Sequence, residues 1–314
     1  MLLKSADDKE SQIAILKNLL NHDKVPAAKK QQIEKELRDL TIGVASEKQA
    51  AYEIDFYFAP SKNIAVIHDL RLEINGRVAQ IDHLLIGRML EVYVLETKTF
   101  STGITINEHG EFSLPYEGKE IGIPSPIEQN NRHIRVLEDA FKEIGHPTRL
   151  GIPMPPSFRS VVLVSPKATI KRPKTSKIDL ESIVKSDSFF TWYMKEMDKL
   201  KPSDVLLAMK IISANTVRDL AEKLTALHKP GRIDYVKKFD LAGALLGNHP
   251  VVEQPATPEY FKKADSGEGK RNAYYCFACK ITIPDVVADY CWKNKPRFGG
   301  RTYCRPCQTK FQRG

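Results

Sequence analysis

The stretch that decides the fold is residues 78–98, VAQIDHLLIGRMLEVYVLETK. It contains two runs of β-branched and apolar residues on either side of a turn at Gly87. Short runs of this kind, bounded by turn residues, predict β-strands. A third such run at 64–70 precedes them across an Asn-Gly pair at 75–76, which is typical of tight hairpins. The three runs therefore predict one sheet.

Helical segments are expected to cover this sheet. Residues 126–144 have helical character and precede another apolar strand at 160–165. The order of helix, three strands, helix and strand predicts an α/β fold in which helices flank a short mixed sheet. The glycines and prolines between 99 and 125 indicate a loop.

Further helices are predicted at both ends of this core. Residues 6–40 carry apolar residues at helical spacing and predict a hairpin that breaks at 24–26, and a third helix is expected after Gly43. Segments 180–200 and 205–228 predict accessory helices. The polar, Pro- and Gly-containing stretch that follows predicts a linker holding only short structure.

Two carboxylates and an amine are expected to meet at one edge of the sheet. Asp82 lies near the end of one predicted strand, and Glu96-Thr97-Lys98 ends the next. Because side chains alternate along a strand, Glu96 and Lys98 project to the same face and Thr97 to the other. The sequence therefore brings together groups suited to metal-assisted cleavage of a phosphodiester.

The donor types favour a hard divalent cation, Mg²⁺ or Mn²⁺, because such ions take oxygen ligands. Asp82, Glu96 and the backbone carbonyl of Thr97 would leave coordination positions for water and a phosphate oxygen. Lys98 can position or help deprotonate the attacking water and balance the charge that builds on phosphorus.

The pattern resembles a known signature. Asp82, followed after thirteen residues by Glu96-Thr97-Lys98, is similar to the D…(D/E)XK motif of the PD-(D/E)XK restriction-endonuclease-like superfamily. The flanks resemble the nuclease-related domain (NERD) family over about residues 41–165. The segments that carry this resemblance, in the family's order, are Gly43-Val44-Ala45-Ser46-Glu47, residues 80–87 (QIDHLLIG), residues 94–99 (VLETKT) and Pro126-Ile127-Glu128-Gln129.

The resemblance implies site residues that spacing alone does not. In that superfamily the helix glutamate, here Glu47, supports a metal directly or through water, and the glutamine after the sheet, here Gln129, lines the site. The implied catalytic set is Glu47, Asp82, Glu96, Lys98 and Gln129, with Glu47, Asp82, Glu96 and Thr97 around Mg²⁺. His133, where some relatives have tyrosine, and Arg132 are expected to contact phosphate. One departure is Ile81, where many members have proline.

The implied function is hydrolysis of DNA by a Mg²⁺-dependent endonuclease, with a role in DNA repair, plasmid processing or defence against foreign DNA. A helicase or another protein is a conceivable partner. Two alternatives stay open, because a Glu-x-Lys at a strand end also occurs by chance and a nuclease fold can lose turnover and serve as a nucleic-acid-binding or docking adaptor. Asp82 favours the enzyme, since a carboxylate inside an apolar run is costly without a cation.

The cysteines point to a second metal. All five lie in the last 39 residues, and Cys276, Cys279, Cys304 and Cys307 form two CxxC pairs separated by 24 residues. Four thiolates at this spacing suit one tetrahedral Zn²⁺, and the segment resembles a zinc ribbon with a small hairpin and core. Metal binding would supply folding free energy that so short a segment lacks. Cys291 is expected to be a buried small apolar residue, although it could replace one ligand.

The tail is also basic. The chain carries a formal charge of +9, and residues 271–314 hold nine basic residues against two acidic ones. Arg297, Arg301 and Arg305, interleaved with aromatic residues, favour contact with DNA or RNA. A stabilising or protein-docking module is the alternative interpretation of this segment.

Composition limits the remaining possibilities. With 314 residues, 42% hydrophobic and 28% charged, the chain has an ordinary globular composition and no apolar run long enough to cross a bilayer. The start does not resemble a secretory signal, so a cytoplasmic location is expected. The expected organisation is a helical segment at 1–40, the nuclease-related domain at 41–175, accessory helices at 176–228, a linker at 229–270 and the zinc ribbon at 271–314.

Overall fold

The strands predicted around residues 78–98 lie side by side in a mixed sheet. The computed structural model describes residues 1–100, 103–176, 178–199, 211–246, 274–278, 282–283 and 285–309. In these residues the main sheet has six strands in the order β1 (Leu2–Lys4), β2 (Ile64–Ile74), β3 (Arg77–Gly87), β4 (Glu91–Lys98), β10 (Ser157–Val164) and β12 (Ile183–Lys185). The central strand β4 is buried from Val92 to Glu96, which explains its unbroken apolar run.

The strand directions make the sheet mixed. β3 pairs antiparallel with both β2 and β4, whereas β10 runs parallel to β4 and β12 runs parallel to β10. The carboxyl ends of β4 and β10 therefore lie at one edge, with Lys98 opposite Val164.

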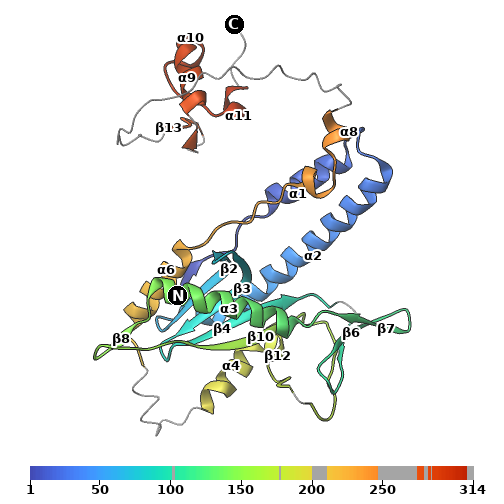
Figure 1. Cartoon of the computed structure of the whole chain (residues 1–314), viewed down its shortest axis with the longest axis vertical. Coiled ribbons are helices and arrows are strands. Elements are labelled where there is room, and N and C mark those ends of the chain that lie inside the picture. The colour runs from blue at the N-terminus through green and yellow to red at the C-terminus, as the bar shows by residue number, and fades with distance from the viewer. Residues whose placement is uncertain are drawn as a thin grey trace. The chain divides into compact units, whose positions relative to one another are not determined.

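Helices cover both faces of this sheet (Figure 1). On one face α3 (Pro126–Ile144) and α6 (Ala214–Ala226) pack on the sheet through residues such as Phe141 and Leu220. On the other face α2 (Ala27–Phe58) and α4 (Phe189–Asp198) pack through residues such as Ile54 and Phe189. The predicted α/β architecture, a mixed sheet flanked by helices, is confirmed.

The boundaries of α3 follow from its sequence. Pro126 occupies the first turn, where its missing N–H costs nothing, and the Glu128 N–H donates to Ser125 Oγ at 3.3 Å. Gly145 follows the helix with a φ of 84°, a conformation that side chains disfavour. The predicted bounds of this helix are therefore confirmed.

The N-terminal helices differ from the prediction in one respect. α1 (Glu10–Leu20) and α2 form the expected hairpin, which extends away from the sheet (Figure 1). However, α2 continues through Gly43 as one helix of 32 residues, so the separate third helix was wrong. A single glycine costs a helix only about 1 kcal/mol, and packing at both ends outweighs this.

The far end of the hairpin has a small apolar core of its own. Leu16 and Ile33 are fully buried there against Tyr235, Phe239 and Leu241. These last residues belong to or follow α7 (Tyr235–Lys238), and α8 (Ala242–Leu246) comes next. The first part of the expected linker is thus packed against the hairpin, and its remainder from 247 lies outside the described residues.

The expected loop between the main sheet and α3 holds three strands of a second sheet. Its order is β11 (Ile170–Lys171), β5 (Ile104–Ile106), β6 (Phe112–Tyr116) and β7 (Lys119–Ile123). Tight turns with glycine at positive φ, such as Gly118, join its strands. The glycines marked turns between short strands, so the loop prediction was wrong here.

The accessory region contains a strand that was expected to be helix. Within 180–200, β12 and a short 3-10 turn η1 (Ser186–Ser188) precede α4. The segment joins the edge of the main sheet because Val162–Val164 of β10 pairs with Ile183–Lys185. Within 205–228, α6 starts only at Ala214, and 200–210 lie outside the described residues. A two-stranded hairpin of β8 (Thr148–Arg149) and β9 (Ile152–Pro153) completes this part.

The chain divides into two units, Met1–Pro250 and Val251–Gly314. In the second, β13 (Tyr274–Tyr275) pairs with β14 (Thr282–Ile283), followed by α9 (Asp285–Lys293), α10 (Lys295–Phe298) and α11 (Arg305–Gln308). The sequence placed a hairpin between the two CxxC pairs, whereas the hairpin present here has its first strand before Cys276. In the described part of the segment between the pairs, helices make up most of the residues. Among the helices that the structure describes, none has the length and apolar content that a bilayer crossing needs.

Candidate active site and metal centre

Glu96, Lys98 and Gln129 form a triangle of hydrogen bonds at the carboxyl end of β4. Lys98 Nζ lies 2.9 Å from Glu96 Oε1 and donates to Gln129 Oε1 at 3.0 Å. The Gln129 side-chain amide in turn donates to Glu96 Oε1 at 2.7 Å. The strand supplies the two charged groups from one face, and α3 packs on that face and supplies the amide. The structure thus brings together the three side chains that the sequence grouped.

Asp82 lies beside this triangle because β3 and β4 separate there. Their antiparallel pairing runs from Ile86–Val92 to His83–Leu95, and beyond it the Thr97 N–H donates to Asp82 Oδ2 at 2.7 Å. A side-chain carboxylate thus takes the place that a backbone carbonyl would hold in a continued ladder. This holds Asp82 at the same edge as Glu96.

Burial raises the pKa of three carboxylates at the site, and for two of them neighbouring carboxylates add to the shift. Burial, reinforced by the charges of Glu96 and Glu47, raises the pKa of Asp82 well above its usual value. Burial raises the pKa of Glu47 to about 7, and Asp69 adds to the shift. Burial also raises the pKa of Glu96, although Lys98 opposes this shift. Accumulated negative charge of this kind marks a functional site more often than a structural one.

His133 and Arg132 of α3 lie next to the triangle. His133 Nδ1 is 3.5 Å from Glu96 Oε2, and both atoms are buried without a hydrogen-bond partner among the described residues. Burial, Arg132 and Lys98 lower the pKa of His133 to about 4, so the imidazole is uncharged at neutral pH. Arg132 itself is exposed. The structure places His133 within reach of Glu96. The contact of both residues with phosphate stays a prediction.

The donor set fits a hard divalent cation. Glu96 Oε2 is a buried carboxylate oxygen that no hydrogen bond satisfies among the described residues, and the raised carboxylate pKa values reflect charge that a cation would neutralise. The three carboxylates do not yet converge on one point. Among the described residues, the oxygens of Glu47, Asp82 and Glu96 do not all lie within 4.8 Å of one another. Asp82 Oδ2 accepts from Thr97 and Glu96 Oε1 from Lys98 and Gln129.

Asp69 is a nearby carboxylate that the sequence analysis missed. It is buried, has a φ of 52°, and accepts hydrogen bonds from Lys9 Nζ at 2.7 Å, the Asp7 N–H at 3.1 Å and the Gln80 side-chain amide. Gln80 belongs to the motif around Asp82, and it was the one sequence feature that could have pointed to a polar partner such as Asp69. The N-terminal partners came from distant sequence and could not be foreseen.

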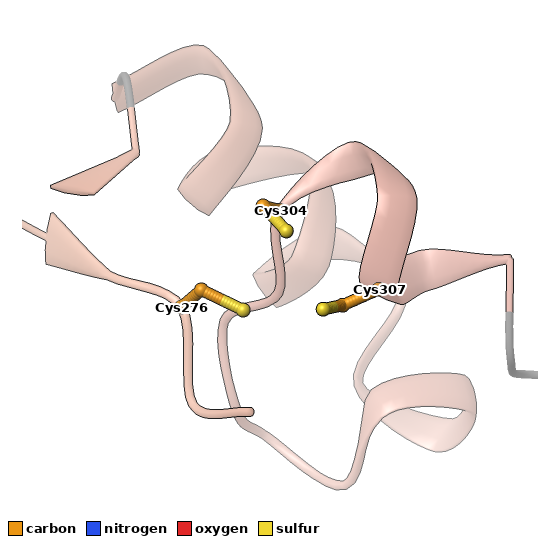
Figure 2. A group of neighbouring side chains, drawn as sticks. All are labelled: Cys276, Cys304 and Cys307. Carbon is orange, nitrogen blue, oxygen red and sulfur yellow. The ribbon is translucent and has the colours of Figure 1, made fainter. Parts of the chain in front are cut away.

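The second unit contains a cluster of thiols. Figure 2 shows the Cys276, Cys304 and Cys307 side chains pointing toward one another, and their sulfur atoms all lie within 4.8 Å of one another. Cys304 precedes α11 and Cys307 lies in its first turn, so the helix start presents both sulfurs together. Such a cluster can bind a metal such as Zn²⁺ and is compatible with a zinc ribbon. Cys279, the predicted fourth ligand, lies outside the described residues.

Cys291 lies in a different environment. It is fully buried, and its sulfur accepts hydrogen bonds from the Tyr303 N–H and the Gln308 side-chain amide, each at 3.3 Å. It is not part of the group of three ligand sulfurs found in the described residues. The burial agrees with the expected packing role.

The basic residues of the second unit are associated with aromatic rings. The Arg301 guanidinium lies 3.9 Å from the centroid of the Phe277 ring, and that of Arg297 lies 5.1 Å from the Phe298 centroid. Arg301 and Phe277 are both exposed. The side chain of Arg305 lies outside what the structure describes. The exposed pair offers a positive charge and a flat apolar surface next to each other.

Comparisons with known proteins address the first unit. No curated protein and no solved structure matches the chain. Residues 42–165, which include Glu47, Asp82, Glu96, Lys98 and Gln129, match the family model of the nuclease-related domain (NERD), and the chain therefore contains a nuclease-related domain.

Proposed function

We propose that the protein is a Mg²⁺- or Mn²⁺-dependent endonuclease that hydrolyses DNA phosphodiester bonds. The observation that carries the proposal is the triangle of Glu96, Lys98 and Gln129 beside Asp82. If Glu96 and Lys98 formed only a structural ion pair, the second carboxylate of Asp82 would not be needed beside them. The pKa values of Asp82 and Glu96 would not need to be raised either. The match to a nuclease-related domain supports the same class of reaction.

Each residue has a defined task in this proposal. Asp82 and Glu96, with Glu47 and the carbonyl of Thr97, would hold the cation, which polarises the phosphate and activates water when bound. Lys98 balances the charge that develops on the phosphate, and its ammonium is held in place by Glu96 Oε1 and Gln129 Oε1. Gln129 keeps Glu96 oriented without adding charge.

The second unit would hold the substrate. Arg301 on the Phe277 ring, together with Arg297 and Arg305, would bind the polyanionic backbone, and a structural Zn²⁺ held by Cys276, Cys279, Cys304 and Cys307 would fold the unit. Roles in DNA repair, plasmid processing or defence against foreign DNA fit this activity, as does a cytoplasmic location.

The test is cleavage of supercoiled plasmid by the wild type, Lys98→Ala and Lys142→Ala, each with Mg²⁺, Mn²⁺ or EDTA. Lys142 is an exposed lysine of α3 and serves as the matched control. We expect cation-dependent nicking that EDTA abolishes, that falls at least about 100-fold in Lys98→Ala and that Lys142→Ala retains. Absence of cutting by the wild type with either cation, with plasmid still shifted on a gel, would instead support a binding adaptor.

A further inference from the structure

A chain of hydrogen bonds crosses the sheet on the face opposite the triangle. Asp55 Oδ1 lies 3.1 Å from His68 Nε2, His68 Nδ1 lies 2.8 Å from His83 Nδ1, and His83 Nε2 lies 3.1 Å from Thr97 Oγ1. The four groups come from α2, β2, β3 and β4 in turn. The chain ends at the residue between Glu96 and Lys98.

The two imidazoles are unusual in this position. His68 is 2% exposed and His83 is 1% exposed, and the same face carries Val66, Leu85 and Leu95. Aliphatic residues would fill these places without the cost of burying polar rings. The cost is offset only because every ring nitrogen has a partner, so the arrangement must be kept as a complete network.

The order of donors along the chain follows from its carboxylate end. An ionised Asp55 can only accept, so His68 Nε2 carries a hydrogen and His68 Nδ1 is left as an acceptor when the ring is neutral. His83 must then donate from Nδ1, which leaves His83 Nε2 to accept from the Thr97 hydroxyl. The hydrogen bond between His68 Nδ1 and His83 Nδ1 needs one nitrogen that carries no hydrogen, so the two rings cannot both be charged. Every donor therefore points away from Thr97 toward Asp55.

Thr97 needs such support because the ladder between β3 and β4 stops before it. The last backbone pair on this side is His83–Leu95. Beyond it, Thr97 is linked to β3 by its N–H, which donates to Asp82 Oδ2 at 2.7 Å, and by its hydroxyl, which contacts His83. Side chains of adjacent β3 residues thus hold Thr97, one at its backbone N–H and the other at its hydroxyl.

We propose that Asp55, His68 and His83 are positioning residues that fix Thr97 through a one-directional hydrogen-bond chain, and that this sets the geometry of Asp82, Glu96 and Lys98. The chain touches none of the reacting groups directly. Its effect on catalysis rests on the proposed nuclease function, whereas its donor order does not.

The donor order is tested without any activity measurement. ¹⁵N-histidine labelling of the full chain and long-range ¹H–¹⁵N spectra report which ring nitrogen is protonated, and His68→Gln and His83→Gln identify the two signals among the eight histidines. We expect His83 protonated at Nδ1 and His68 at Nε2 near pH 7. A His83 ring protonated at Nε2 would overturn the proposal even if the protein cuts DNA, and the expected pattern in an inactive protein would leave the chain intact while refuting the nuclease.

The effect on catalysis is tested by substitutions at the end of the chain. Thr97→Val keeps the branched shape but lacks the hydroxyl, Thr97→Ser restores it, and Thr99→Val removes an exposed hydroxyl two residues away as the matched control. We expect Thr97→Val to lower kcat about 10- to 100-fold with little change in KM, and Thr97→Ser to recover most of the loss. Equal kcat in the wild type and Thr97→Val, or equal losses in the valine and serine variants, would refute the positioning role.

Discussion

The side-chain amide of Gln129 donates to Glu96 Oε1 at 2.7 Å, the same carboxylate oxygen that lies 2.9 Å from the Lys98 ammonium. An amide from a helix thereby bonds to both members of an ion pair on one strand. Because Gln129 Oε1 also accepts from Lys98, removing the amide would leave the ion pair but free both side chains to rotate. Gln129 is therefore a sensitive position at which to alter the site without changing its charge.

Gln129→Ala is expected to lower kcat for plasmid nicking about 10- to 100-fold while leaving KM nearly unchanged, because orientation rather than substrate binding is lost. Gln129→Glu is expected to be more severe, since it adds a carboxylate next to Glu96. Asn131→Ala, on the same helix, is the control. Among the described contacts, the Asn131 side-chain amide donates only to the exposed Glu128. A Gln129→Ala variant with wild-type kcat would contradict the assigned role.

The free energy of unfolding of the first unit should fall as the pH rises from 5 to 8. The measurement is made in EDTA, so that no divalent cation neutralises the carboxylates. The folded-state pKa of Glu47 is raised to about 7, above its unfolded value, so the folded protein holds a proton that ionisation removes at a free-energy cost. The stabilisation is present at low pH and is lost as the pH passes 7, and the raised pKa values of Asp82 and Glu96 act with the same sign.

Glu47→Gln isolates this contribution. It should flatten the pH dependence of the melting temperature, by the equivalent of about 1–3 kcal/mol at pH 8. Fluorescence of Trp192 in a Trp292→Phe background reports on the first unit alone, because the chain has two tryptophans and one lies in each unit. Parallel pH profiles for Glu47→Gln and the parent would count against the raised pKa.

Removing zinc should unfold the second unit and leave the first intact. In a Trp192→Phe background, Trp292 reports on the second unit. Its ring centroid lies 4.8 Å from that of Tyr274. Chelation is expected to change its emission, and Cys304→Ser should abolish the one bound Zn²⁺ measured by mass spectrometry. Cys291→Ser should still bind one Zn²⁺, since that sulfur lies outside the cluster. Loss of zinc from Cys291→Ser would reverse this assignment.

Asn130 should be a stabilising residue rather than a catalytic one, although it neighbours Gln129. It is fully buried, and its amide nitrogen donates to Val94 O at 2.6 Å and to Val161 O at 3.2 Å, which ties α3 to β4 and β10. Asn130→Ala leaves buried carbonyls without these donors and should destabilise the first unit by about 1–3 kcal/mol. Denaturation followed by Trp192 fluorescence checks this value, with Asn131→Ala expected to change stability little.

The parts of the fold that could be predicted are those decided by local pattern. The strands around Asp82 and Glu96 and the whole of α3 follow from apolar runs, turn residues and a proline at the helix start. The strand β12 could not be foreseen, because its pairing with β10 depends on a distant segment. The strands β5–β7 pair with their neighbours in sequence, and they were missed because the glycines and prolines around them also suit a loop. The continuous helix α2 was missed for a related reason: a glycine is a weak local signal, and tertiary packing outweighs it.

The candidate site shows the same division. Alternation along a strand was enough to place Glu96 and Lys98 together, and the family resemblance assigned Gln129 and His133 to the same site. The structure adds the contact between His133 and Glu96. The histidine chain was not predicted, although His83 immediately follows Asp82. Its meaning depends on the cross-strand register His68–His83, which is a property of the folded sheet.

Because α2 is one uninterrupted helix, it connects the distant hairpin core to the candidate site. At 1.5 Å per residue its 32 residues span about 48 Å, and Glu47 lies about 30 Å from Ala27 but only about 16 Å from Phe58. The shorter arm is fixed against the sheet by Ile54 and Phe58, while the longer arm carries the hairpin core around Ile33. Because no break separates the two arms, we expect a displacement of the hairpin core to move the part of α2 that carries Glu47.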